Sequence, residues 1–86
     1  MKEFQFVIRD ELGIHARPAG LLAKAAKSFT GTTITITKDG STVKATQLMK
    51  LMSLAVKKGS TVTVAAEGPA EDEAITAMQK FFEENL

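Results

Sequence analysis

Hydrophobic and polar residues alternate along three stretches of the chain, 2–9, 32–37 and 61–66. An apolar residue, mostly aromatic or β-branched, occupies every second position, which is typical of a strand with one buried face. The pair Asp39-Gly40 follows the second stretch, and this pair is favoured in two-residue hairpin turns. The residues after the turn, 42–44, therefore predict a fourth, short strand.

A helical spacing of apolar residues replaces the alternation in three other stretches, 16–28, 46–54 and 71–85. Thr46 is a candidate cap for the middle helix, and acidic residues fill the first turn of the last helix, as the helix dipole prefers. The residues expected to face the core are Ala19, Leu22, Ala26 and Phe29 in the first helix, Leu48, Leu51 and Leu54 or Ala55 in the second, and Ala74, Ile75, Met78, Phe81 and Phe82 in the third.

The predicted order is strand, helix, strand, strand, helix, strand, helix. With every helix on one face of a four-stranded sheet, this order predicts an α+β fold, a two-layer open-faced β-sandwich. No linker, repeat or low-complexity segment interrupts the 86 residues. We therefore expect a single domain over residues 1–86.

Composition excludes several classes of protein. The chain has no cysteine and one histidine, which rules out a disulfide framework, a cysteine-based zinc site and a multi-histidine metal site; no metal or cofactor is expected. A net charge of +1 without any basic run, Tyr or Trp argues against nucleic-acid binding. The start resembles no signal peptide and no apolar run could span a membrane. We expect a cytoplasmic protein without membrane insertion.

One short segment combines residues that suit phosphoryl chemistry. His15 follows a loop that contains Gly13 and precedes the first predicted helix, with Arg17 two residues later and Pro18 in the first helical turn. An imidazole is a good nucleophile near neutral pH, and the free N–H groups of a helix N-terminus attract anions. Arg17 adds a permanent positive charge. A lone histidine at a helix start can equally be an ordinary surface residue or a cap, so the residue types leave both interpretations open.

The segment 13–19, Gly-Ile-His-Ala-Arg-Pro-Ala, resembles the active-site signature of the HPr family, the phosphocarriers of the bacterial phosphoenolpyruvate:sugar phosphotransferase system. Segment 50–54, followed by Lys58-Gly59, and segment 66–68 before the last helix are similar to the same family. The resemblance covers essentially the whole chain, and its first motif is highly specific.

The resemblance implies a fold of four antiparallel strands with three helices on one face. It also implies that enzyme I, which draws its phosphoryl group from phosphoenolpyruvate, phosphorylates His15 on Nδ1, and that His15 passes the group to IIA domains of sugar permeases. The chain would be a phosphotransfer intermediate rather than an independent enzyme. On the same basis Arg17 is the charge partner of the phosphoryl group, the backbone of Ala16 and Arg17 belongs to the phosphoryl site, and Pro18 starts the helix.

The resemblance further implies a surface around His15 that contacts enzyme I and IIA domains, on a protein expected to be a monomer. The sequence adds a reason of its own, because Met49 and Met52 are rotated away from the leucine stripe and methionine suits surfaces that fit several partners. Both methionines can instead pack at the edge of the core. The lysines can be plain solvated residues or can steer acidic partners. The residues of this partner surface are Ala16, Gly20, Lys24, Lys27, Met49, Lys50, Met52 and Ser53.

Regulation is the point at which the chain departs from the family. Many members carry a regulatory serine at the start of the short second helix, and alignment on segment 50–54 places Gln47 there, one residue after Thr46. Glutamine cannot be phosphorylated. Counting from His15 instead places Thr46 at the regulatory position, but the chain has one more residue between the two motifs, around residues 30–33, and the local motif is the better guide. Modification by an HPr kinase, with Thr46 as the site, is therefore left open.

Two other functions remain open at this stage. A carrier in a regulatory branch, such as the nitrogen-related phosphotransfer chain, would use the same His15 chemistry with different partners. A non-catalytic α/β sandwich that binds a small ligand or RNA would leave His15 dispensable, although no aromatic-rich strand or basic stripe supports it.

Overall fold

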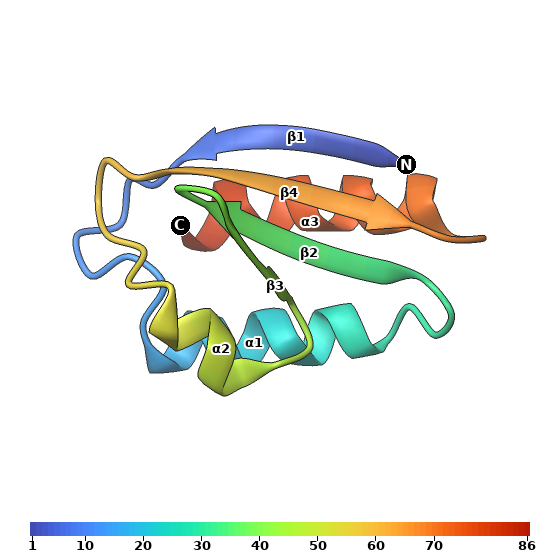
Figure 1. Ribbon diagram of the computed structural model, residues 1–86, viewed down its shortest axis with the longest axis horizontal. Helices are drawn as coiled ribbons and strands as arrows, with labels where there is room; N and C mark the ends of the chain where they lie inside the picture. The colour runs from blue at the N-terminus through green and yellow to red at the C-terminus, as the bar shows by residue number, and fades with distance from the viewer.

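The computed structural model describes all residues, 1–86, as a four-stranded antiparallel sheet with strand order β1-β4-β2-β3, covered on one side by three helices (Figure 1). The α+β fold expected from the sequence is confirmed. The strands are β1 (Lys2–Val7), β2 (Thr33–Lys38), β3 (Ser41–Lys44) and β4 (Thr61–Glu67), and the helices are α1 (Ala16–Lys27), α2 (Leu48–Ser53) and α3 (Glu71–Asn85).

The core lies between the sheet and the helices. Val64 of β4 is opposite Phe4 of β1 and Ile36 of β2, so these apolar residues form one row across the sheet. Phe82 of α3 is fully buried and meets the ring of Phe4 edge-on, with 5.8 Å between centroids. The alternation in the sequence therefore marks the strand face that packs on the helices.

The Asp39-Gly40 hairpin turn is also confirmed. Asp39 has φ 49° and Gly40 has φ 82°, the two left-handed conformations that match the twist of a two-residue hairpin. Asp39 adopts this conformation more easily than most residues, and glycine does so without a steric penalty. The turn joins β2 to β3 in the register that pairs Lys38 with Ser41.

The short helix α2 corrects two predictions. Leu48, expected in the core, is 39% exposed, and Leu51 is the only buried residue of this helix. A helix of only six residues has one side chain that reaches the core, and Leu48 lies in its first turn. Thr46 is not the cap: Gln47 occupies that position, its carbonyl accepts the N–H of Leu51 at 3.0 Å, and its side chain makes no capping bond.

Candidate functional site

The loop between β1 and α1 is fixed at both ends. The main-chain oxygen of Leu86, at the end of α3, accepts the N–H groups of Arg9 at 2.6 Å and Asp10 at 2.8 Å. Further along, the Asp10 carboxylate accepts the N–H of Leu12 at 2.9 Å and closes a short turn. The chain's C-terminus consequently lies at the same end of the molecule as this loop (Figure 1).

Gly13 brings the loop close to the backbone of the α2–β4 connection. Its φ is +65°, and a Cβ there would overlap the carbonyl oxygen of Val56. That same oxygen accepts the N–H of Ile14, whose side chain is buried, at 3.2 Å. Only glycine fits this position, and its close approach sets the point at which His15 leaves the loop.

His15 is the N-cap residue of α1, with extended backbone angles of φ −99° and ψ −174°. Its carbonyl accepts the first helical hydrogen bond, from Ala19 at 2.9 Å, while its side chain makes no capping bond. The partly exposed imidazole has no hydrogen-bond partner within the chain. His15 therefore caps the helix through its backbone alone, and its ring nitrogens are available for chemistry.

The first turn of α1 provides the anion-attracting groups expected from the sequence. The N–H groups of Ala16 and Arg17 have no acceptor within the chain, and Pro18, the next residue, has no N–H to satisfy. Pro18 is buried, which anchors this turn against the body of the protein. The N-terminus of α1 thus presents free donors and a positive dipole end beside His15.

His15 and Arg17 line the same shallow pocket of about 240 Å³. The Arg17 side chain is exposed and forms no ion pair within the chain. Its guanidinium is consequently free to turn toward an anion held at His15. The complete lining comprises Asp10, His15, Arg17, Pro18, Leu21, Glu84 and Asn85.

Sequence reasoning missed four of these residues: Asp10, Leu21, Glu84 and Asn85. Glu84 and Asn85 reach the pocket because the end of α3 is tied to the β1–α1 loop through Leu86. The one local signal is that the last turn of α3 contains no basic residue, although a helix C-terminus favours positive charge.

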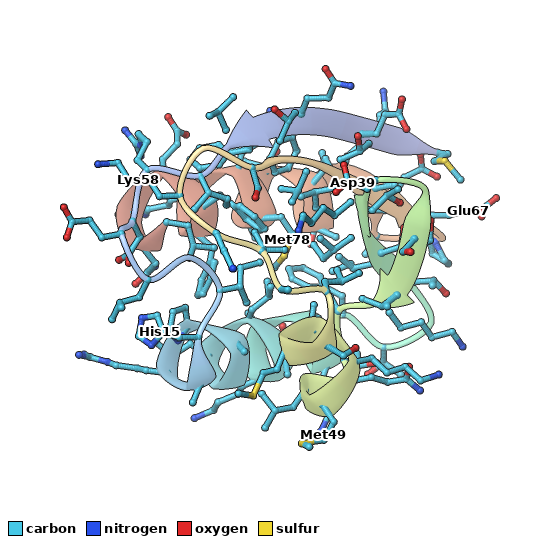
Figure 2. All side chains as sticks on the ribbon, turned by 60° about the vertical axis from the view of Figure 1, so that its left-hand side comes forward. His15, Asp39, Met49, Lys58, Glu67 and Met78 are labelled. Atoms are coloured by element: carbon cyan, nitrogen blue, oxygen red, sulfur yellow. The ribbon has the colours of Figure 1, made fainter.

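The partner surface expected from the sequence lies on α1 and α2. Met49 is 77% exposed and Met52 is 41% exposed, so neither is packed in the core. In Figure 2, Met49 projects outward from α2 in the lower part of the view, where α1 also lies, whereas Met78 lies near the centre. Of the other expected members, Gly20 is half-buried, and the exposed ones are Ala16, Lys24, Lys27, Lys50 and Ser53.

Exposed leucines extend this surface. Leu21 of α1 is 44% exposed and Leu48 of α2 is 39% exposed, in addition to the two methionines. Scattered single apolar residues are normal on a protein surface; here four of them lie on helices α1 and α2, which contact each other. Separately, no helix has the length and apolar character needed to cross a membrane.

Comparisons with known proteins identify the family of this chain. A family model described as "PTS HPr component phosphorylation site" matches residues 2–84. Phosphocarrier protein HPr of Mycoplasma genitalium is 38% identical over 85 residues, covering 99% of this chain and 97% of that protein. The HPr-like protein Crh of Halalkalibacterium halodurans is 45% identical over 83 residues, covering 96% of this chain and 98% of that protein.

The fold comparison gives the same result. A solved structure of the histidine-containing phosphocarrier protein of a Mycoplasma superposes with a TM-score of 0.92 at 35% identity, covering 96% of this chain and 93% of that one. HPr family members are carriers of the phosphotransferase system that interact with enzyme I and IIA proteins. This chain belongs to the HPr family and is a phosphoryl carrier of the phosphotransferase system.

Proposed function

We propose that His15 is the phosphoryl acceptor, and that the chain receives the group from phospho-enzyme I and passes it to IIA domains of sugar permeases. The observation that carries the proposal is the position of His15: its unpaired ring lines a pocket with Arg17 at the N-terminus of α1. In the forward step a P–N bond forms at Nδ1 of His15 as the bond between phosphorus and the donor breaks. Transfer to a IIA domain is the same exchange with His15 as the leaving group.

Arg17 and the first amides of α1 stabilise the transferring group. A phosphoryl group on the ring would carry close to two negative charges near neutral pH. The unpaired N–H groups of Ala16 and Arg17 can donate to its oxygens, and the Arg17 guanidinium can neutralise part of its charge. Pro18 keeps the turn in place, so these donors do not have to be reorganised at the moment of transfer.

The partner surface serves both enzyme I and IIA domains, one after the other, because both must reach the same ring. Its apolar members supply contact area, and Lys24, Lys27 and Lys50 attract acidic partners and speed their encounter. A single domain, residues 1–86, acts as a monomer in the cytoplasm. Sedimentation at micromolar concentration and cell fractionation test these last two points.

The decisive experiment is intact mass spectrometry after incubation with enzyme I and phosphoenolpyruvate. We expect a gain of one phosphoryl group that is lost in acid, as phosphoramidates are, and no gain in His15→Ala. An unchanged mass in the wild type would favour a non-catalytic binding domain, and an equally phosphorylated His15→Ala would refute the assignment. Offering the phosphorylated protein to IIA domains of sugar permeases and of the nitrogen-related branch then separates sugar uptake from regulation.

A further inference from the structure

Two acidic residues line the pocket in which a phosphoryl group would bind to His15. Glu84, in the last turn of α3, and Asp10, in the β1–α1 loop, line this pocket together with Arg17. Neither carboxylate forms an ion pair within the chain. The pocket thus combines one cationic side chain with two anionic side chains, an unusual lining for a site that accepts an anion.

The placement of Glu84 also opposes the local preference of its helix. The C-terminal end of a helix carries a partial negative charge and favours Lys, Arg or His, yet α3 ends without any basic residue of its own. One cation from outside α3 offsets part of the negative charge at this helix end: Arg9 donates from Nη2 to the carbonyl of Glu83 at 2.6 Å. Arg9 does not line the His15 pocket; it lines the adjoining hollow together with Asp10 and Glu84, but no ion pair joins it to either carboxylate. A residue that breaks a local rule at a functional pocket is a candidate for a functional role.

We propose that Glu84, assisted by Asp10, raises the free energy of the phosphorylated form of His15 and thereby keeps the phosphoryl group easy to pass on. The inference rests on the phosphocarrier function proposed above. A carrier whose site contained only Arg17 and a helix N-terminus would hold the dianionic group too firmly. Two nearby carboxylates repel the same dianion and oppose that stabilisation. Glu84 and Asp10 thus act on the phosphoryl group at His15 by charge repulsion, which lowers the stability of the phosphorylated form, and they form no bonds to the group.

The test is a phosphoryl exchange equilibrium between two forms of the protein. Isotope-labelled wild type and unlabelled Glu84→Gln are mixed with a catalytic amount of enzyme I and limiting phosphoenolpyruvate. Enzyme I moves the group between them: one P–N bond breaks and an equivalent one forms, so no other species is consumed at equilibrium. Intact mass spectrometry then gives the phosphorylated fraction of each form. We expect Glu84→Gln to be favoured by about two- to tenfold at low salt, the range for removing one unit charge near a screened dianion.

The chain offers matched controls for this measurement. Glu83 lies in the same turn of α3 but does not line the His15 pocket, so Glu83→Gln should shift the equilibrium little. Glu84→Asp keeps the charge and should also stay near wild type, whereas Asp10→Asn should shift in the same direction as Glu84→Gln while still accepting from Leu12. The Glu84→Gln effect should shrink at about 1 M salt. An equilibrium constant of one for Glu84→Gln, or an equal shift in Glu83→Gln, would overturn the inference.

Failure of this inference can be distinguished from failure of the proposed function. If enzyme I does not phosphorylate the wild type, the proposed function fails, and His15 can still be loaded chemically with phosphoramidate. In hydrolysis of the product, water attacks phosphorus and the P–N bond breaks; one proton of the water goes to the ring nitrogen that held phosphorus, and the hydroxyl leaves with phosphorus as inorganic phosphate. A nearby carboxylate stabilises the protonated ring, which is the leaving group, and so speeds hydrolysis. Phosphorus NMR should therefore show a longer half-life of phosphorylated His15 in Glu84→Gln than in the wild type. Equal half-lives in the wild type, Glu83→Gln and Glu84→Gln would contradict the role of Glu84.

Discussion

Met49 offers the sharpest test of the partner surface, because its contributions to folding and binding can be separated. Burying a whole methionine side chain contributes roughly 1.5–3 kcal/mol. Since 77% of Met49 is exposed, about three quarters of that amount, roughly 1–2 kcal/mol, is available when a partner covers it. Met49→Ala should therefore weaken binding to enzyme I and to a IIA domain by roughly 1–2 kcal/mol, within the range of interface hot spots.

The same arithmetic predicts that Met49→Ala hardly affects folding. Less than about 1 kcal/mol of burial is lost from the free protein, well below the ~2–5 kcal/mol of a buried Met→Ala change. Met78 supplies the matched control, because it is the same residue type and is fully buried under the sheet (Figure 2). Met78→Ala should lose about 2–5 kcal/mol of stability and, as long as it stays folded, keep its affinity for both partners.

The assay combines calorimetric titration of each variant with enzyme I and a IIA domain, and denaturant melts of each variant alone. A loss of affinity for one partner only would contradict a surface shared by both. Strong destabilisation of Met49→Ala with unchanged affinities would refute the reasoning altogether, because it would mean that the side chain acts in folding and not in recognition.

Four other residues can each be tested with one variant or one condition. Arg17→Ala should slow phosphoryl transfer about tenfold or more with no change in Tm, since the guanidinium makes no ion pair in the chain; rapid-quench kinetics and a thermal melt check both. Gly13→Ala should lower the free energy of unfolding by more than about 1 kcal/mol in a denaturant melt, because its φ is +65° and a Cβ overlaps the backbone of the α2–β4 connection. The hydrogen bond from the N-terminal amine holds the pKa of Glu71 below its ordinary value of 4.5. Its folded pKa lies below its unfolded pKa, so the stabilisation is complete above about pH 4.5 and disappears as pH falls through the folded value; melts from neutral to acid pH should show a shallower acid loss in Glu71→Gln. Incubation with an HPr kinase and ATP should add no acid-stable phosphate, and any that is found should disappear in Thr46→Val.

The sequence predicts most of the fold because the large elements have unambiguous periods. Ile34 and Ile36 of β2, and Val62 and Val64 of β4, are all buried as the alternation predicts. The bounds of α3, 71–85, are those expected from the sequence. In these elements the local preference and the tertiary packing agree, which is the condition under which pattern reasoning succeeds.

The errors fall in α2, where the pattern is too short to determine which side faces the core. Its leucines at 48 and 51 and the capping Leu54 repeat with a spacing of three, and such a spacing over so short a segment fits several rotations of the helix. Contacts with β3 and α1 decide the rotation, and they bury Leu51 alone. Leu48 is left partly exposed next to Met49. This residue, wrongly predicted for the core, therefore adds to the apolar part of the expected partner surface.

The His15 site divides between what a local motif can specify and what only the fold can. Histidine, arginine and proline at 15, 17 and 18 are neighbours in sequence, and the helix that begins there supplies the amides, so the positive half of the site was predictable. The negative half is not, because Asp10 and Glu84 are 74 residues apart and meet only through the hydrogen bonds that tie Leu86 to the β1–α1 loop. In the proposed function, both halves act on the same phosphoryl group with opposite sign. Since a carrier must accept the group and also release it, the balance between α1's N-terminus and α3's C-terminus is a property of the tertiary structure, and substitutions far from the His15 motif in sequence can alter it.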